Sequence, residues 1–334
     1  MPSSEPRKAI FLFTHPRTAS NLLMQMLRTH PDMETIEYPF VDTYYFGQDS
    51  LTLRRNVRME AVKQRMQADP ALAQTFQAAF DQLELSIQSV QAKGKTPFIK
   101  EHAFTIMKPE TISTYLAHPR SHTAQLAKGQ GVGVVTTGTD YAPNDGNDGN
   151  PTVLPTQFLR SVTPVFLIRH PALVFESILR VSGPTMGAQV DDEEFPVDAS
   201  LRWLRILHDW FAQSGGHPIV LNADEIIARP TIVQQLCEQL QLDPTGVRFE
   251  WDPVAPAIVA GQSSYQRHFF STIQSSCGVR LDKHSAAQGP KLNLDVMTAT
   301  WRDAYGFETA AALRSFVDAA MPDYEYLCHC ELRH

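Results

Sequence analysis

The sequence predicts an α/β fold in which a parallel sheet of four to five strands is flanked by helices. Four short apolar runs, at residues 9–13, 96–103, 162–168 and 218–222, have the length and composition of buried parallel strands. Amphipathic helical patterns separate these runs along the chain. Polar and basic residues end or follow most of the runs, as expected at the ligand-binding edge of an open α/β sheet.

The remaining regular elements follow from apolar spacing. Helical periodicity predicts helices over residues 172–180, 199–211, 231–242 and 301–320. The segment 30–60 opens with the helix-stopping pair His30-Pro31 and then holds a cluster of aromatic residues, namely Tyr38, Phe40, Tyr44, Tyr45 and Phe46. Dense aromatics can line an acceptor pocket, but core packing is the favoured interpretation.

We expect a single domain spanning residues 1–334, a length that one large α/β domain can reach. Residues 50–92 are rich in Gln, Ala, Arg and Leu, which predicts a helical insertion of two helices broken near Asp69-Pro70. Residues 118–157 are rich in Gly, Asn, Asp and Pro, which predicts a flexible loop. This loop could close over a substrate, although a plain insertion is the favoured interpretation.

The composition and charge of the chain argue against several classes of protein. A net charge of −7 argues against a nucleic-acid or heparin binder. Four cysteines do not make a disulfide framework in a chain of this length, and Cys328-His-Cys330 lacks the second ligand pair of a zinc site. We find no apolar leader and no long apolar run, so we expect a cytoplasmic protein with no membrane partner and no metal. The oligomeric state is left open, with a homodimer as one option.

The first apolar run leads into a polar turn that carries Arg17, Thr18, Ser20 and Asn21, and helical spacing begins at Leu22. A strand, a tight turn and a helix N-terminus form an anion site, because free backbone N–H groups and the helix dipole point into the turn. Hydroxyls and a guanidinium suit phosphate or sulfate oxygens. The alternative is an ordinary surface turn with a solvated arginine.

The motif Pro16-Arg-Thr-Ala-Ser-Asn21 resembles the 5′-phosphosulfate loop of sulfotransferases that use 3′-phosphoadenosine 5′-phosphosulfate (PAPS), which commonly reads Pro-Lys-Ser-Gly-Thr-Thr. It lacks the glycines and the lysine of an NTPase loop. The resemblance implies the P-loop NTPase-like sulfotransferase fold. It also implies that the donor is bound by the loop residues Arg17, Thr18, Ala19, Ser20 and Asn21.

The second strand ends in Lys100-Glu-His102, whose lysine and histidine side chains can point the same way because they lie two residues apart. Histidine is the usual general base near neutral pH, and an ammonium can stabilise a transferring sulfuryl group. The alternative is a solvated lysine and a capping histidine. Soluble sulfotransferases end this strand with Lys-x-His, so the resemblance implies that His102 is the base and that Lys100 and Arg17 stabilise charge.

The third strand is followed by Arg169-His-Pro171 and, eight residues after the arginine, by Ser177. A planar guanidinium and a hydroxyl can together bind a phosphate. The spacing is similar to the sulfotransferase motif Arg-Asn-Pro-x5-Ser. The resemblance therefore implies that Arg169 and Ser177 bind the 3′-phosphate of the donor.

Later parts of the chain fit the family less closely. Residues 222–230 resemble the Tyr-Glu-Asp-Leu-x3-Pro stretch of the family, but Leu22 and Ala223 occupy the places where the family often stacks adenine on aromatic rings. The family also closes the 3′-phosphate site with a late basic, glycine-containing segment. Here that match is loose, and its candidates are Arg280, Lys283 and Lys291.

The resemblance implies a PAPS-dependent sulfotransferase that sulfates a hydroxyl of a small organic acceptor, such as a secondary metabolite, and releases 3′,5′-adenosine bisphosphate. The acidic balance favours a small, uncharged acceptor over a sulfated polysaccharide. Two alternatives stay open: a protein of this fold that binds a nucleotide or metabolite without sulfating it, and an enzyme that catalyses another step such as elimination.

Overall fold

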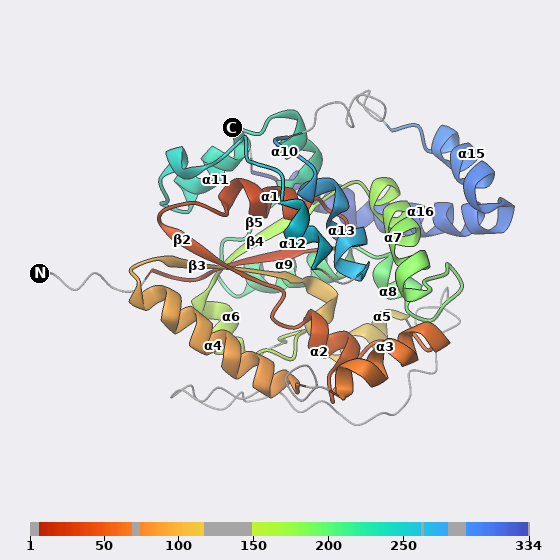
Figure 1. The fold of residues 1–334 in the computed structure, drawn as a ribbon, viewed down its shortest axis with the longest axis horizontal. Coiled ribbons are helices and arrows are strands. Elements are labelled where there is room, and N and C mark those ends of the chain that lie inside the picture. Colours follow the sequence, from red (N-terminus) through yellow and green to blue (C-terminus); the bar gives the residue numbers. More distant parts are fainter. Residues whose placement is uncertain (1–6, 69–73, 117–148, 262–263, 280–291, 333–334) are drawn as a thin grey trace, which may run out of the picture. The chain divides into compact units, whose positions relative to one another are not determined.

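The computed structural model describes residues 7–68, 74–116, 149–261, 264–279 and 292–332. Its strands form a five-stranded sheet in the order β2-β3-β1-β4-β5 (Figure 1). The strands are β1 Ile10–Thr14, β2 Met33–Glu37, β3 Thr96–His102, β4 Thr163–Ile168 and β5 Ile219–Asn222. The pairs β2–β3, β3–β1 and β1–β4 are parallel. The predicted α/β class, with a parallel sheet flanked by helices, is therefore confirmed.

The strand β1 lies in the core, and all five of its residues are buried. Its rings pack with those of the neighbouring strand, since the centroids of Phe13 and Phe166 lie 5.2 Å apart. Phe13 also lies 5.5 Å from Phe211. A parallel strand covered on both faces carries no polar alternation, which explains the continuous apolar run in the sequence.

The strand β2 is the strand of the sheet that the sequence did not predict. Only Met33 of its five residues is buried, whereas Glu34 and Glu37 are partly or fully exposed. As the first strand in the sheet order, β2 pairs with β3 alone. An edge strand with charged side chains does not give the apolar signal of a central strand, which is why the pattern failed here.

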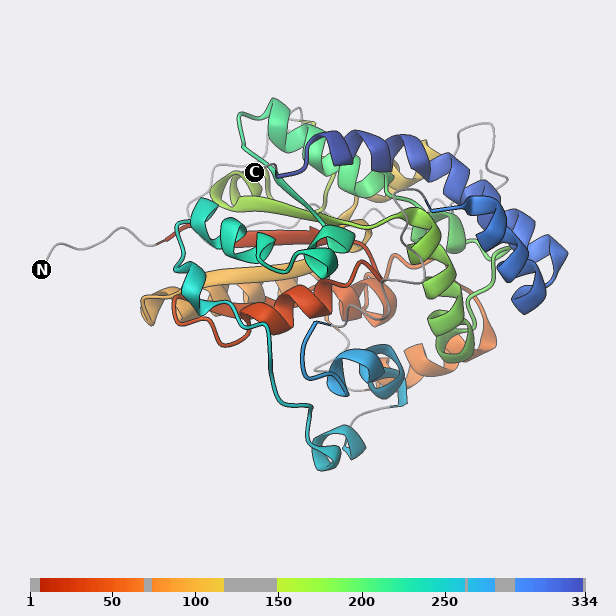
Figure 2. The same cartoon turned by 90° about the horizontal axis from the view of Figure 1, so that it is seen from above.

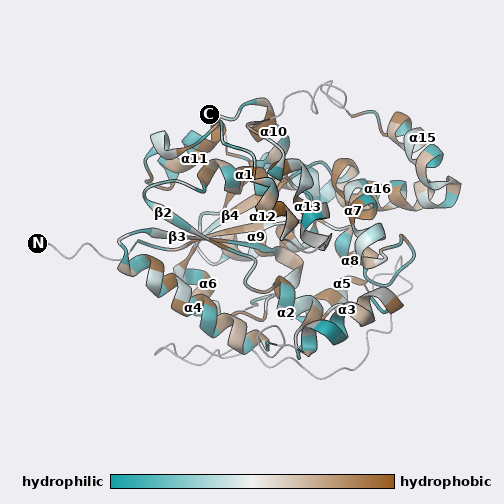
Figure 3. Ribbon diagram, in the orientation of Figure 1, coloured by the Kyte–Doolittle hydropathy of each residue, from teal (hydrophilic) through white to brown (hydrophobic). Residues whose placement is uncertain are grey.

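The chain groups into two compact units, each described here by itself. Unit 1 comprises residues 1–15, 33–166 and 191–219. Its helices are α2 Val41–Phe46, α3 Val57–Gln67, α4 Phe76–Ala92, η1 Ala103–Ile106, α5 Pro109–Leu116, α6 Thr156–Ser161, α8 Phe195–Asp198 and α9 Arg202–Gln213. The long helix α4 packs on β2 and β3 and carries an apolar and a polar side (Figure 3). The two predicted insertion helices are α3 and α4.

Unit 2 comprises residues 16–32, 167–190 and 220–334. Its helices are α1 Ser20–Leu27, α7 Pro171–Met186, α10 Ala223–Ala228, α11 Ile232–Gln239, η2 Pro244–Gly246, α12 Pro256–Ala260, α13 Ser264–Gln274, α15 Leu294–Tyr305 and α16 Phe307–His329. The helices α15 and α16 pack on each other, and α16 packs on α7 (Figure 2).

Several predicted boundaries need correction. The closing helix predicted over 301–320 is two helices, because Gly306 adopts φ 86° between α15 and α16. The predicted loop 118–157 lies largely outside the described residues, and its last two residues belong to α6. The expectation of a single domain stays a prediction. Within the described part of the chain, every helix is too short or too polar to cross a lipid bilayer.

Candidate active site

The loop that follows β1 has an uncommon backbone. Arg17 and Ala19 have φ values of 66° and 56°, a left-handed conformation that non-glycine residues seldom adopt. Ala19 precedes α1, and its carbonyl accepts the N–H of Leu22 at 2.9 Å. No acidic residue lies in the first turn of α1, so no side chain of that turn offsets the positive end of the helix dipole. Backbone strain of this kind concentrates at functional sites.

The other predicted loop ligands differ in exposure. Thr18 and Ser20 are buried, at 0% and 4% exposure, and Asn21 is half-buried. The hydroxyl-bearing side chains of Thr18 and Ser20 are therefore shielded from solvent, and the side chain of Asn21 is partly shielded. Their binding of a donor stays a prediction.

Arg17 and Ser177, which lie 160 residues apart in the sequence, are in direct contact. The Arg17 Nε–H donates to Ser177 Oγ at 3.0 Å, and Arg17 Nη1 donates to the carbonyl of Phe269 at 3.4 Å. Arg180, one turn along α7, donates from Nη2 to the same Ser177 oxygen at 3.2 Å. Two guanidinium groups thus converge on one hydroxyl, which is an arrangement suited to an anion.

Arg169 joins the same group of cations. Its Nη1 donates to the carbonyl of Arg17 at 3.4 Å, and its Nε donates to Asp224 Oδ1 at 3.1 Å. Asp224 lies in the first turn of α10, where its N–H donates to the capping side chain of Asn222 at 3.0 Å. The carboxylate therefore orients the guanidinium of Arg169 while leaving its side chain 24% exposed.

The start of α7 explains why Arg169 is presented here. Pro171 occupies the first turn of the helix, and His170 Nδ1 accepts the N–H of Ala172 at 3.2 Å. Burial lowers the pKa of His170, which keeps the imidazole neutral and able to accept this hydrogen bond. The helix therefore begins directly after Arg169, as the motif predicted.

The strand β3 carries Lys100 and His102 in unit 1. Lys100 is fully buried, and its Nζ lies 4.2 Å from the ring centroid of Tyr38 and 3.5 Å from Glu37 Oε2. The ring of His102 lies 4.9 Å from the ring of Tyr38, and its Nδ1 lies 2.8 Å from Thr14 Oγ1. Tyr38 thus contacts both predicted catalytic side chains.

Glu101, between these two residues, is fully buried and holds the backbone of the site. Its carboxylate accepts the N–H of His102 at 2.6 Å and the N–H of Phe40 at 2.7 Å. Burial raises the pKa of Glu101 to about 7, although both backbone hydrogen bonds oppose the shift. The side chain therefore anchors β3 to the segment that begins α2.

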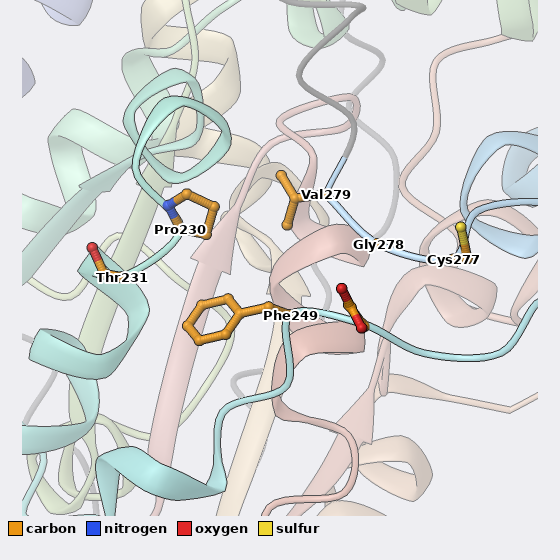
Figure 4. A pocket seen from close by; sticks show the side chains of 7 residues that line it. Pro230, Thr231, Phe249, Cys277, Gly278 and Val279 are labelled. Carbon is orange, nitrogen blue, oxygen red and sulfur yellow. The ribbon is translucent and has the colours of Figure 1, made fainter.

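A cavity of about 440 Å³ lies elsewhere in unit 2, between the segment after α10 and the segment after α13 (Figure 4). Pro230, Phe249 and Val279 give it an apolar wall, and Glu250 is the charged residue in its lining. None of the predicted anion-binding residues in the described part of the chain lines this cavity.

The structure thus separates the predicted residues into two groups. Within unit 2, Arg17 contacts both Arg169 and Ser177, whereas Lys100 and His102 share β3 within unit 1. The convergence of the two groups stays a prediction. The basic candidates Arg280, Lys283 and Lys291 lie outside the described residues.

Sequence reasoning missed three residues of these groups, namely Thr14, Arg180 and Asp224. Tyr38 was named among the aromatic residues, with core packing favoured, and the structure places it half-buried against Lys100 and His102. The i, i+3 spacing from Ser177 could have indicated Arg180, because residues three apart share a helix face. No local signal marks Thr14 or Asp224, since they meet their partners only through sheet register or through α10. No group of His, Cys, Asp and Glu in the described part of the chain is arranged to hold a metal ion.

The parallel sheet flanked by helices places the chain in the α/β class of proteins. No protein-family model matches the chain. The chain is 30% identical to the sulfotransferase ppzF of Metarhizium majus (strain ARSEF 297) over 341 residues, which cover 97% of this chain and 96% of that protein. It is 28% identical to the sulfotransferase ppzF of Metarhizium rileyi (strain RCEF 4871) over 342 residues, with the same coverage. The chain therefore belongs to the sulfotransferase family.

Solved structures with a similar trace include two sulfotransferase domains. One comes from the curacin biosynthetic pathway, with a TM-score of 0.43, 15% identity and coverage of 90% of this chain and 99% of that domain. The other comes from the Synechococcus PCC 7002 olefin synthase, with a TM-score of 0.40, 16% identity and coverage of 91% and 97%.

Proposed function

We propose that the chain transfers a sulfuryl group from PAPS to a hydroxyl of a small organic acceptor and releases 3′,5′-adenosine bisphosphate. The observation that carries this proposal is the 3.0 Å hydrogen bond from Arg17 to Ser177. It joins the loop that resembles a 5′-phosphosulfate site to the helix that resembles a 3′-phosphate site. A donor with phosphates at both positions has the chemistry to bind there.

The residues of unit 2 fit such a donor in charge and in hydrogen-bonding capacity. The guanidinium groups of Arg17, Arg169 and Arg180 supply donors for phosphate oxygens, and Ser177 completes them. An arriving phosphate would compete with Asp224 for Arg169. Leu22 and Ala223 offer no aromatic face, so adenine is expected to make aliphatic rather than stacked contacts there.

The residues of unit 1 supply the proton chemistry in this proposal. His102 removes the proton from the acceptor hydroxyl as the bond to sulfur forms. Lys100 and Arg17 stabilise the negative charge on the transferring group and on the leaving phosphate. The donor itself supplies the sulfuryl group. The net charge of −7 favours an uncharged acceptor, since an anionic one would be repelled.

The first test measures binding of 3′,5′-adenosine bisphosphate by calorimetric titration. Arg169→Ala is expected to weaken binding by about 2–4 kcal/mol, because a charge-assisted contact to phosphate is lost. Arg229→Ala is the matched control, since Arg229 is an exposed arginine paired with Glu225 on α10. Adenosine 5′-phosphate should bind the wild type more weakly than the bisphosphate.

Two results would contradict the proposal. If the wild type and Arg169→Ala bind 3′,5′-adenosine bisphosphate with equal affinity, Arg169 does not bind the 3′-phosphate. Tight bisphosphate binding without sulfation of any member of a broad panel of phenols and alcohols would instead favour a nucleotide-binding protein or an enzyme for another step, such as elimination.

A further inference from the structure

We infer that Thr14 is a positioning residue that fixes the tautomer of His102, an inference that rests on the proposed role of His102 as the base. Thr14 is the last residue of β1 and is fully buried. In the parallel register of β1 and β3, Thr14 is the partner of His102. Paired residues of neighbouring strands project on the same side of a sheet, which brings the hydroxyl beside the imidazole.

The Thr14 hydroxyl can make hydrogen bonds to both of its polar neighbours in only one arrangement. Thr14 Oγ1 lies 3.1 Å from the carbonyl oxygen of Glu101 and 2.8 Å from His102 Nδ1. A hydroxyl has one hydrogen, and a carbonyl oxygen can only accept. The hydroxyl hydrogen is therefore donated to Glu101, and the hydroxyl oxygen accepts a hydrogen from His102 Nδ1.

A neutral imidazole carries one N–H, so this arrangement leaves the lone pair of His102 on Nε2. That nitrogen is then the one able to take a proton from an acceptor hydroxyl. When His102 becomes an imidazolium, its Nδ1–H still donates to Thr14. The hydrogen bond therefore persists in both protonation states and keeps the ring in one orientation during proton uptake.

Four further contacts hold the backbone and the faces of His102. Glu101 accepts its backbone N–H, and the hydroxyl of Thr105 donates to its carbonyl at 2.7 Å. The ring centroids of Tyr38 and Phe104 lie 4.9 and 6.1 Å from the centroid of the His102 imidazole. Thr14 adds a polar atom directed at one ring nitrogen, Nδ1.

The test compares the wild type with Thr14→Val, which keeps the branched shape and removes the hydroxyl, and with Thr14→Ser, which keeps the hydroxyl. Proteins labelled with ¹⁵N-histidine are observed by NMR, and His102→Gln assigns the signals of His102. The wild type is expected to show Nδ1 protonated and Nε2 unprotonated when neutral. Thr14→Val should shift the population toward the Nε2–H form, and Thr14→Ser should restore the wild-type pattern.

Kinetics provide the second readout. Thr14→Val should lower kcat by about 10- to 100-fold, a range typical of losing a partner that orients a catalytic group, with KM and bisphosphate affinity near wild type. The ascending limb of its pH profile should move to lower pH, because the imidazolium loses a hydrogen-bond acceptor. Thr35→Val on β2 is the matched control, since Thr35 pairs with Phe98 rather than with His102.

The outcomes separate this inference from the proposed function. An Nε2–H tautomer in the wild type, or an unchanged tautomer in Thr14→Val, overturns the role of Thr14 even if sulfuryl transfer depends on His102. An Nδ1–H tautomer that Thr14→Val abolishes supports the inference even if no sulfuryl transfer is found. The wild-type spectrum alone decides which nitrogen of His102 is protonated, and Thr14→Ala supplies a second variant without the hydroxyl if Thr14→Val folds poorly.

Discussion

Tyr38 is the half-buried aromatic residue that contacts both Lys100 and His102 in unit 1. Its φ of 56° is uncommon for an aromatic residue and costs on the order of 1–3 kcal/mol. The conformation persists because the N–H of Tyr38 donates to the carbonyl of Lys100 at 2.8 Å while its ring lies over the ammonium. The strained backbone of Tyr38 lies beside two candidate catalytic residues. Such a conformation lowers the stability of the fold, but it fixes the position of the ring beside Lys100 and His102.

At the residue scale, kinetics should separate the base from the donor ligand. His102→Ala is expected to lower the turnover of sulfuryl transfer by about 10²- to 10⁴-fold, the usual contribution of a general base, with bisphosphate affinity nearly unchanged. Arg17→Ala should weaken both binding and turnover, because Arg17 is expected to contact the donor before and during the reaction. Steady-state rates and calorimetry on both variants check this, and full activity of His102→Ala would exclude it as the base.

Residue spacing predicted part of this site and could not predict the rest. Arg17 and Ser177 were found from local motifs, because each follows a strand at a fixed distance. Thr14 meets His102 only through the register of β1 and β3, and Asp224 reaches Arg169 only through its place on α10. Register and helix packing are long-range properties, so a single sequence does not reveal these partners.

At the scale of elements, the sequence predicted buried strands well and exposed elements poorly. β4 is confirmed within one residue because its run is continuously apolar. β2 was missed because its polar side chains resemble a loop. Gly306 separates α15 from α16, but the apolar spacing is helical on both sides of it. Apolar spacing alone therefore does not show where one helix ends and the next begins.

A buried polar cluster ties α8 and the segment before it to the segment after α2, within unit 1. Glu194 accepts hydrogen bonds from the hydroxyls of Tyr44 and Thr52, at 2.6 and 3.1 Å, and from the backbone N–H of Leu53. Arg54 pairs with Asp192 at 3.0 Å and with Asp198 at 2.7 Å. Burial raises the pKa of Glu194 to about 7, and the neighbouring carboxylate of Asp198 adds to the shift.

This cluster predicts a stability that falls with pH. The raised pKa lets the folded protein hold a proton on Glu194 up to about pH 7, whereas the unfolded chain releases it near the ordinary glutamate pKa of 4.5. The stabilisation is therefore complete below pH 4.5 and is lost as the pH rises through 7. Between pH 4.5 and pH 7, the free energy of unfolding measured in urea should fall less for Glu194→Gln than for the wild type. The two decreases should differ by on the order of 2 kcal/mol. The exposed Glu60→Gln on α3 is the control, and parallel pH dependence of all three proteins would contradict the prediction.

At the scale of the whole molecule, two strands contribute residues to both units. The boundaries between the units fall inside β4, between Phe166 and Leu167, and inside β5, between Ile219 and Val220. All of these residues are buried, at 7% exposure or less. Opening one unit alone would break two strands in the middle, so we expect the chain to unfold as one cooperative domain.

Hydrogen exchange with and without bisphosphate tests this expectation. A ligand at about 100 times its Kd stabilises the folded state by about 2.7 kcal/mol, which slows exchange through global opening by about 100-fold. In one cooperative domain, the slowest amides of β1 and β3 should gain as much protection as those of α7 and α16, although the residues proposed to bind the donor lie in unit 2. Arg169→Ala should lose the effect in both places. Protection confined to unit 2 would mean that the two units open independently and that the chain is two domains.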